Sequence, residues 1–439
     1  MRKDEPSVFV VQVMTFGATC SPSSAQFVKN SNAQRFVDQF PKVVEVIVED
    51  HYVDDLLCSV ETEEEALDLI RQIRFIHGQA GFEIRGWMSN STVVTEALKD
   101  SPAIDKNLNV EAKLATEKVL GLWWDTASDM FTFRLSIKHD QKLLSGTKVP
   151  TKREVLRTLM TVFDPLGFLG NLLMFLKILL QEIWRSGVQW DQQIGDEQFE
   201  KWRRWLKELS KVELVTIPRC YRLLTSPDAT NTIQLHIFVD ASIDGYAAVA
   251  YFRFEEKGKI ECYLITSKTR VAPIKFVCIP RLELQAAVIG ARLARSIAET
   301  HKLQIKERYF WTDSRDVLFW LASDHRRFTQ FVGFRVGEIL ETTDVSEWNW
   351  LRSRENVADE GTKWQKAPDL APSSRWFCGP DFLWKPIQEW PGKPSDPYVT
   401  EQELQRTMNH HSVVENVVNF EDFSVATCAA HRFYSTFSN

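Results

Sequence analysis

Apolar residues alternate with polar ones through the second half of the chain, and this pattern predicts a mixed five-stranded sheet with helices. In QLHIFVDASIDGYAAVAYFRF, residues 234–254, an apolar run ends at Asp240 and a Ser-Ile-Asp-Gly turn leads into a second β-rich run. Such a pair of runs is typical of a β-hairpin. Further strands are expected in IECYLITSKTRVAP, ERYFWTD and SEWNWL, and a helix in the alanine-rich run RLELQAAVIGARLARSIAE.

Four acidic residues occupy special positions in these elements. Asp240 and Asp313 end two strands, Glu283 lies near the start of the alanine-rich helix, and Asp359 lies in a final helical segment, ENVADEGTKW. Each acid alone is best explained as a solvated surface charge or a helix cap, so the specific signal is the ordered set of four. Carboxylate oxygens suit Mg²⁺, or alternatively Mn²⁺, and two such ions can clamp a phosphodiester for hydrolysis.

The segments FVDAS, LELQAA, FWTDS and NVADEGT resemble the four signature segments of the ribonuclease H fold as they occur in Pao/BEL-type LTR retrotransposon polyproteins. The resemblance implies that Asp240, Glu283, Asp313 and Asp359 are catalytic and hold two Mg²⁺ ions, and that RNA in an RNA–DNA hybrid is cleaved. Many ribonucleases H carry a mobile His shortly before the last Asp, whereas this chain has residues 351–354, LRSR, there. Four basic residues are candidate contacts for the nucleic-acid backbone: Lys268, Arg270, Arg326 and Arg327.

The N-terminal part shows a second arrangement of strands around acids. VFVVQVMTFGATCSPSSAQF predicts a strand, a turn, a small-residue loop and the start of a helix. VVEVIVEDHYVDDLLCSV predicts two strands joined by a tight hairpin that presents Asp54 and Asp55. A helix is expected over residues 61–81, another strand in FEIRGWMSNS and a hairpin in KVLGLWWDTASDMFTFRLS.

These segments resemble the palm of a reverse transcriptase, an RNA-directed DNA polymerase. The resemblance implies catalytic, metal-binding roles for Asp54 and Asp55, a nucleotide pocket and a primer contact; the pocket and contact residues are Tyr52, Phe16, Gly17, Trp123 and Trp124. A surface turn is the alternative for the acidic hairpin, and cross-strand packing is the alternative for the paired Trp residues. Because only a short lead with Asp4 and Glu5 precedes the Phe-Gly turn, the third palm Asp is missing and polymerase activity is expected to be lost.

The middle of the chain is predicted to be helical and resembles the thumb and connection region of Pao-type polymerases. Thr151 and Glu154 have capping-box spacing. KWRRWLK, residues 201–207, either presents cations and aromatics to nucleic acid or buries its Trp residues in a core. After Trp364 a Pro- and Trp-rich stretch resembles a polyprotein spacer, and its Trp376, Trp384 and Trp390 are expected to dock on the nuclease part.

Composition limits the remaining choices. The chain has 439 residues, 44% of them hydrophobic, a net charge of −6 and seven Cys without a C-x-x-C motif. These values predict several globular domains in an intracellular protein, cytoplasmic or nuclear and not secreted, with nucleic-acid binding confined to local basic patches. The apolar run 166–176 is too short to span a membrane, so no membrane partner is expected.

The predicted fold class is α/β and α+β multidomain. The expected domains are a truncated reverse-transcriptase palm (1–140), a helical thumb/connection (141–226), a ribonuclease H-like mixed five-stranded sheet with helices (227–366) and a spacer with a C-terminal tail (367–439). The expected partners are an RNA–DNA hybrid or primer-template and other polyprotein segments. The alternative function is that of a non-catalytic nucleic-acid-binding remnant or co-opted transposon protein.

Overall fold

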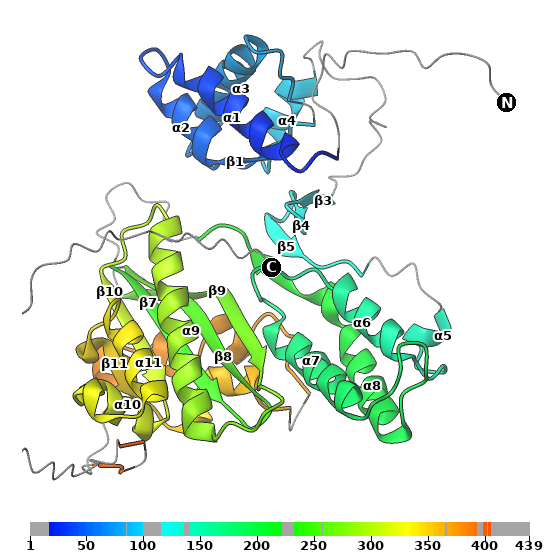
Figure 1. Ribbon diagram of the computed structural model, residues 1–439. Helices are drawn as coiled ribbons and strands as arrows, with labels where there is room; N and C mark the ends of the chain where they lie inside the picture. Colours follow the sequence, from blue (N-terminus) through cyan, green and yellow to red (C-terminus); the bar gives the residue numbers. More distant parts are fainter. Residues whose placement is uncertain are drawn as a thin grey trace, which may run out of the picture.

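The computed structural model describes residues 17–84, 86–99, 116–135, 141–221, 232–256, 258–364, 367–392, 398–401 and 403–404. Within these ranges the chain forms an N-terminal helical body, a four-stranded antiparallel sheet with adjoining helices, and a larger part built on a five-stranded sheet (Figure 1). None of the helices in these ranges combines the length and apolar character needed to cross a membrane.

The five-stranded sheet has the order β11-β10-β7-β8-β9. Strands β7, β8 and β9 form an antiparallel meander, and β10 runs parallel to both β7 and β11. The mixed five-stranded sheet predicted from the sequence is therefore confirmed. Its strands are β7 (Thr232–Ala241), β8 (Gly245–Glu256), β9 (Lys259–Val271), β10 (Glu307–Thr312) and β11 (Trp348–Trp350).

One face of the sheet is covered by helices α9 (Ile279–Thr300), α10 (Arg315–Ala322) and α11 (Gln330–Leu340), as Figure 1 shows for α9. The odd-numbered apolar residues of β7 point into this core, because successive side chains of a strand face opposite sides. Gly290 lets α9 approach the sheet closely, since a Cβ there would lie 2.6 Å from Val239 Cγ1.

The opposite face is covered by helix α7 (Gly170–Arg185) and by a C-terminal segment that holds α12 (Arg375–Cys378) and the 3₁₀ turns η7 (Asp381–Trp384) and η8 (Ile387–Glu389). Trp376 is fully buried in this second core. The indole Nε1 of Trp376 donates to the carbonyl of Phe168 at 2.7 Å, and the hydroxyl of Tyr251 donates to the carbonyl of Trp376 at 2.6 Å. Segments assigned from the sequence to connection and spacer thus share one core with the sheet.

The other two spacer tryptophans differ from each other. Trp390 packs beside Tyr309 of β10, with ring centroids 5.1 Å apart, so it docks on the sheet as predicted. Trp384 is 43% exposed and donates only to the carbonyl of Cys378, so the prediction that it docks is wrong. Its position after the buried Leu383 turns the indole towards solvent.

Helices α5 (Gln141–Leu144), α6 (Lys152–Thr161), α7 and α8 (Asp196–Leu209) form the helical middle of the chain. The predicted capping box at Thr151 and Glu154 is present. Trp202 and Trp205 of α8 are both fully buried, so this face of the basic and aromatic run packs in the core. The small sheet beside these helices consists of β3 (Thr116–Val119), β4 (Leu122–Asp125), β5 (Met130–Thr132) and β6 (Thr216–Pro218).

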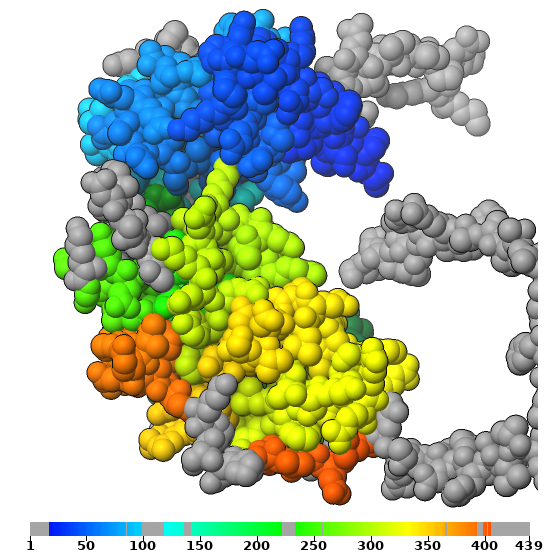
Figure 2. Space-filling model, turned by 90° about the vertical axis from the view of Figure 1, so that its left-hand side faces the viewer, coloured from blue at the N-terminus to red at the C-terminus, as the bar shows by residue number. Residues whose placement is uncertain are grey.

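The N-terminal body contains α1 (Ser21–Gln34), α2 (Pro41–Glu49), β1 (His51–Tyr52), β2 (Asp55–Leu56), α3 (Glu63–Gly78) and α4 (Thr92–Lys99). The predicted helix over residues 61–81 and the tight hairpin at Asp54 are confirmed. Figure 2 shows this body, in blue, above the yellow-green part of the chain. Lys302, just after α9, lies 3.5 Å from a Glu45 oxygen and 3.5 Å from an Asp50 oxygen.

Two strands predicted for this body are not formed. Residues 43–48 lie in helix α2, where Val43, Val44, Val46 and Ile47 share a buried face. That spacing also fits a helical period, and packing against α1 and α3 outweighs the β propensity of Val and Ile. Residues 82–84 and 86–91 form no strand. Gly86 has φ +71 there, outside the extended region.

Candidate functional site

The carboxyl ends of β7 and β10 place two of the predicted acids side by side. Phe238 of β7 pairs in register with Trp311 of β10, and both point into the second core. Two residues further on, Asp240 and Asp313 therefore emerge on the same side of adjacent parallel strands, whose spacing is about 5 Å. Asp240 is only 3% exposed.

Glu283 reaches the same place from the first turns of helix α9. Its neighbours Leu282 and Leu284 are buried, which holds the start of α9 against the sheet. The hydroxyl of Ser314, the residue after Asp313, donates to Glu283 Oε2. Ser314 also caps α10 by accepting from the backbone N–H of Val317, so one side chain connects Glu283 to the end of β10.

Asp359 lies in the 3₁₀ turn η6 (Val357–Gly361), not in the final α-helix that the sequence predicts. The side chain of Asn356 at the start of η6 donates to the carbonyl of Val239 at 2.9 Å and more weakly to Asp313 Oδ1 at 3.4 Å. Just beyond the turn, the hydroxyl of Thr362 donates to Asp240 Oδ2. The turn is thus fastened to the ends of both strands, and Asp359 lies between its two attachment points.

The structure brings together Asp240, Glu283, Asp313 and Asp359, and we name this group the acid edge. Burial, followed by the nearby charge of Asp313, raises the pKa of Asp240 from 3.8 to about 7. Burial also raises the pKa of Glu283 from 4.5 to about 7, the Ser314 hydrogen bond opposes this rise, and Asp313 again adds to it. The acid edge therefore carries more carboxylates than its own surroundings stabilise in the ionised form.

This donor set fits a hard divalent cation, because such ions prefer carboxylate oxygens and offset their mutual repulsion. Within the described ranges, however, no three Asp, Glu, His or Cys side chains are arranged as a ready ligand set. Each acid instead accepts from a neighbour, and Asp359 pairs with Lys363. Ion binding therefore requires these side chains to rotate away from their present partners: Thr362, Ser314, Ser353 and Lys363.

We expect Mg²⁺ to stabilise the protein more at high pH than at low pH. The pKa values of Asp240 and Glu283 are raised in the folded state, so without a cation the folded protein holds their protons more tightly than the unfolded chain does. Stability from these groups is then full at about pH 4 and is lost as the pH rises through about 7.

Thermal unfolding with and without Mg²⁺, at about pH 5.5 and about pH 8, measures this difference. The Mg²⁺-induced rise in Tm should be larger at the higher pH, and Asp240→Asn should reduce it. An equal rise at both pH values would contradict the assignment of these acids as ligands.

The partners of the acids were not identified from the sequence. Ser314, Asn356, Thr362 and Lys363 lie inside or directly beside the segments FWTDS and NVADEGT, so proximity to those segments was the available signal. Ser353 donates to Asp313 Oδ2 from the LRSR stretch, where many ribonucleases H have a His. Only the folded chain shows which of these side chains meets which acid.

The predicted basic contacts are at the surface. Lys268 and Arg270 of β9 pair in register with Ala248 and Tyr246 of β8, at the end of the sheet where β7 ends. Both are exposed. Arg326 and Arg327 are exposed in the 3₁₀ turn η3 (His325–Arg327), between α10 and α11.

The residues for which the resemblance to a reverse transcriptase implies a role lie in the N-terminal part of the chain, not at the acid edge. Tyr52 is 70% exposed, and Asp54 is exposed at the hairpin tip. Asp55 accepts a hydrogen bond from the backbone N–H of Leu120 at 3.2 Å. Gly17 is the first residue described, and Phe16 lies outside the described residues.

Trp123 and Trp124 are partly buried in the small sheet, where each faces an arginine. The guanidinium of Arg134 lies 4.8 Å from the Trp123 ring, and that of Arg219 lies 5.5 Å from the Trp124 ring. Trp124 Nε1 also donates to Asp129 at 3.0 Å. These contacts are internal, and a primer contact stays a prediction.

The sheet order, the helices on both faces and the acid edge define a ribonuclease H-like domain. Residues 151–314 match the family described as the Pao retrotransposon-like RNaseH-like domain. The match covers less than half of the chain, and the matched range includes α6, α7 and α8 together with three of the four acids.

No curated protein matches the sequence. Among 48 matching chains of solved structures is the N-terminal RNase H domain of Rv2228c from Mycobacterium tuberculosis, solved as a fusion with maltose-binding protein. It is 10% identical, with a TM-score of 0.22, and the match covers 30% of this chain and 91% of that chain.

Proposed function

We propose that the acid edge hydrolyses the RNA strand of an RNA–DNA hybrid. The single observation that carries this proposal is the gathering of Asp240, Glu283, Asp313 and Asp359 at one end of the mixed sheet by three separate hydrogen-bonded attachments. Burial and a neighbouring like charge make Asp240 and Glu283 expensive to ionise without a cation, so a purely structural role explains them poorly.

The ions implied are two Mg²⁺, with Mn²⁺ as an alternative. When bound, they would activate a water molecule and neutralise charge on the reacting phosphate. Asp240 and Asp313, at the ends of adjacent strands, would hold the ions together with Glu283 and Asp359. Ser314, Asn356 and Thr362 orient three of the four carboxyl groups or the elements that carry them.

Basic side chains beside the acid edge support a nucleic-acid backbone as the substrate. A basic surface beside the acid edge suits contact with phosphates, and contact with 2′-hydroxyl groups would distinguish the RNA strand of a hybrid from DNA. Exposed Lys268 and Arg270 are the basic groups placed at that end of the sheet. Selection of a hybrid over other duplexes would then follow from groove shape and from contact with ribose.

We propose that the N-terminal part does not polymerise DNA. Asp54 and Asp55 lie on a hairpin with two residues in each strand, and the adjacent predicted palm strand is helix α2. Two-metal catalysis of nucleotidyl transfer with this pair alone would leave its ions weakly held. The N-terminal part would then be a remnant of a polymerase that still folds but has no catalytic role.

The proposal is tested by incubating the intact chain with a labelled RNA–DNA hybrid, an RNA duplex and a DNA duplex, each with Mg²⁺ or EDTA. Cleavage of only the RNA strand of the hybrid, only with Mg²⁺, is expected. Primer extension by the same preparation is expected to be absent. Equal cutting of the DNA duplex would contradict hybrid selection, and no cutting of any substrate would reject the hydrolase.

Binding of nucleic acid without cleavage is the second candidate. It is favoured by one observation: Lys363 pairs with Asp359 and the other acids accept from hydroxyl groups, so each acid has a partner within the protein. A chain that binds the hybrid tightly but does not cut it would support this candidate.

A further inference from the structure

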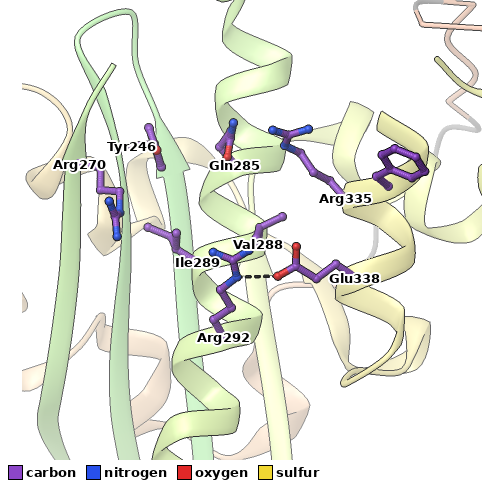
Figure 3. Close-up of a pocket in the computed structure, with 9 residues that line it drawn as sticks. Tyr246, Arg270, Gln285, Val288, Ile289, Arg292, Arg335 and Glu338 are labelled. Carbon is purple, nitrogen blue, oxygen red and sulfur yellow. Dashed lines mark hydrogen bonds and ion pairs between the residues drawn. The ribbon is translucent and has the colours of Figure 1, made fainter. Parts of the chain in front are cut away.

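A groove lined by arginines lies beside helix α9, on the face of the sheet that α9 and α11 cover. It has a volume of about 340 Å³ and contains Arg270 from β9, Arg292 from α9 and Arg335 from α11 (Figure 3). Tyr246 and Phe334 line it as well. We name it the arginine groove. Its size falls in the range of sites for nucleotide-sized groups.

The charges in the arginine groove are only partly neutralised. Arg292 donates to Glu338 at 2.5 Å, the pair joined by the dashed line in Figure 3. Arg335 donates to the carbonyl of Phe331 at 2.9 Å and stacks on its ring, and it makes no ion pair within 4 Å among the described residues, where Glu338 is already paired with Arg292. The backbone of Arg270 pairs with Tyr246 in the sheet, whereas its side chain makes no hydrogen bond or ion pair with any residue the structure describes. The groove is thus a positively charged site on a chain whose net charge is −6.

One aromatic side chain of the groove, Phe334, is exposed to solvent. Phe334 is 70% exposed, although a phenyl ring at the surface of a helix is normally covered. Exposed rings next to arginines are typical of surfaces on which bases or riboses stack while the cations contact phosphates. Anionic groups attached to flat rings are therefore the ligand chemistry that this groove suits.

The sheet register relates the arginine groove to the acid edge. Ala241, next to Asp240, pairs with Tyr246, and Tyr246 pairs with Arg270. Arg270 thus lies two strands from the end of β7, about 10 Å away. A strand of a helix advances about 3.4 Å per nucleotide along the axis, so this distance corresponds to about three nucleotides.

We propose that the arginine groove binds the backbone of one nucleic-acid strand about three nucleotides from the position cut at the acid edge. Arg270 and Arg335 contact its phosphates, and Phe334 supports a base or ribose. This inference rests on the proposed function, because it takes the strand at the acid edge to be nucleic acid. It adds a binding site that uses α11 and the outer side of α9.

The test measures binding of a fluorescent RNA–DNA hybrid in EDTA, so that no strand is cut, over a range of salt concentrations. Arg270→Gln and Arg335→Gln are each expected to weaken binding about tenfold at about 0.1 M salt and to lower the slope of log K against log salt by about 1. Arg295→Gln is the matched control, because this exposed α9 residue faces Glu299 and not the groove. It should bind like the unmodified chain.

A third variant and a competition experiment distinguish the proposed binding site from the alternatives. Phe334→Ala changes an exposed side chain, so it tests stacking even if Arg335→Gln perturbs folding. Unchanged binding and slope in the Arg270 and Phe334 variants would overturn the inference, as would failure of the unmodified chain to bind hybrid. Saturable binding of adenosine monophosphate that does not compete with the hybrid would instead assign the groove to a free nucleotide. Loss of binding in the variants, from a chain that never cuts hybrid, would retain the groove and reject only the hydrolase.

Discussion

Replacing Asp313 with asparagine is expected to lower the rate of hybrid cleavage by about a thousandfold or more. Asp313 stands between the other acids: its charge raises the pKa of both Asp240 and Glu283, so it lies close to both. Loss of its carboxylate removes a cation ligand from the middle of the acid edge, and the charge stabilisation at stake is several kcal/mol. The measurement is the rate of RNA-strand cleavage under single-turnover conditions.

Asparagine keeps the shape of the side chain: its Oδ1 can still accept from Asn356, and its Nδ2 can donate to the hydroxyl of Ser353, so the fold should persist. The thermal stability of Asp313→Asn without Mg²⁺ should rise, because a like charge next to Asp240 is removed. Asp244→Asn is the matched control, an exposed turn residue four positions after Asp240. A cleavage rate within a few-fold of the unmodified chain for Asp313→Asn would remove this residue from the site.

Trp376→Ala is expected to lower the free energy of unfolding by about 3–5 kcal/mol. The side chain is fully buried between the sheet and the loop before α7, and its indole satisfies the carbonyl of Phe168. Truncation leaves a large cavity and an unpaired buried carbonyl. Urea unfolding of the intact chain measures the change.

Trp384→Ala is the matched control in the same segment. Because Trp384 is 43% exposed, its replacement should cost about 1 kcal/mol or less. Equal effects of the two substitutions would show that residues 370–390 are not part of the core that packs on the five-stranded sheet. A large effect for Trp376 alone would establish that this segment is structurally required by the sheet.

Much of the candidate site could be predicted from local sequence. The apolar alternation before Asp240 and before Asp313 marks two strands, and an acid directly after a buried strand must lie at the edge of the sheet. Helix α9 was predictable from its alanine-rich pattern, which places Glu283 in its first turns. Partners such as Thr362 could not be predicted, since the contact with Asp240 joins residues 122 positions apart.

The helical middle shows where local pattern leaves two solutions. In the run 201–207 the same spacing of Trp and basic residues serves a nucleic-acid face or a core face, and burial of Trp202 and Trp205 depends on what α8 meets. In α2 the β-branched residues fit both a strand and a helix. Packing of these residues against α1 and α3 stabilises the helix.

The sequence by itself determined the strands, the main helix and the acids that end them, because alternation and helical period are properties of neighbouring residues. Tertiary structure alone decided that α7 and residues 370–390 form the second layer on the sheet, that Ser314, Asn356 and Thr362 hold the acid edge together, and that Arg270, Arg292 and Arg335 share one groove. The physical reason is that burial, charge crowding and pocket shape arise between segments that are distant along the chain, and no local pattern specifies which surfaces meet.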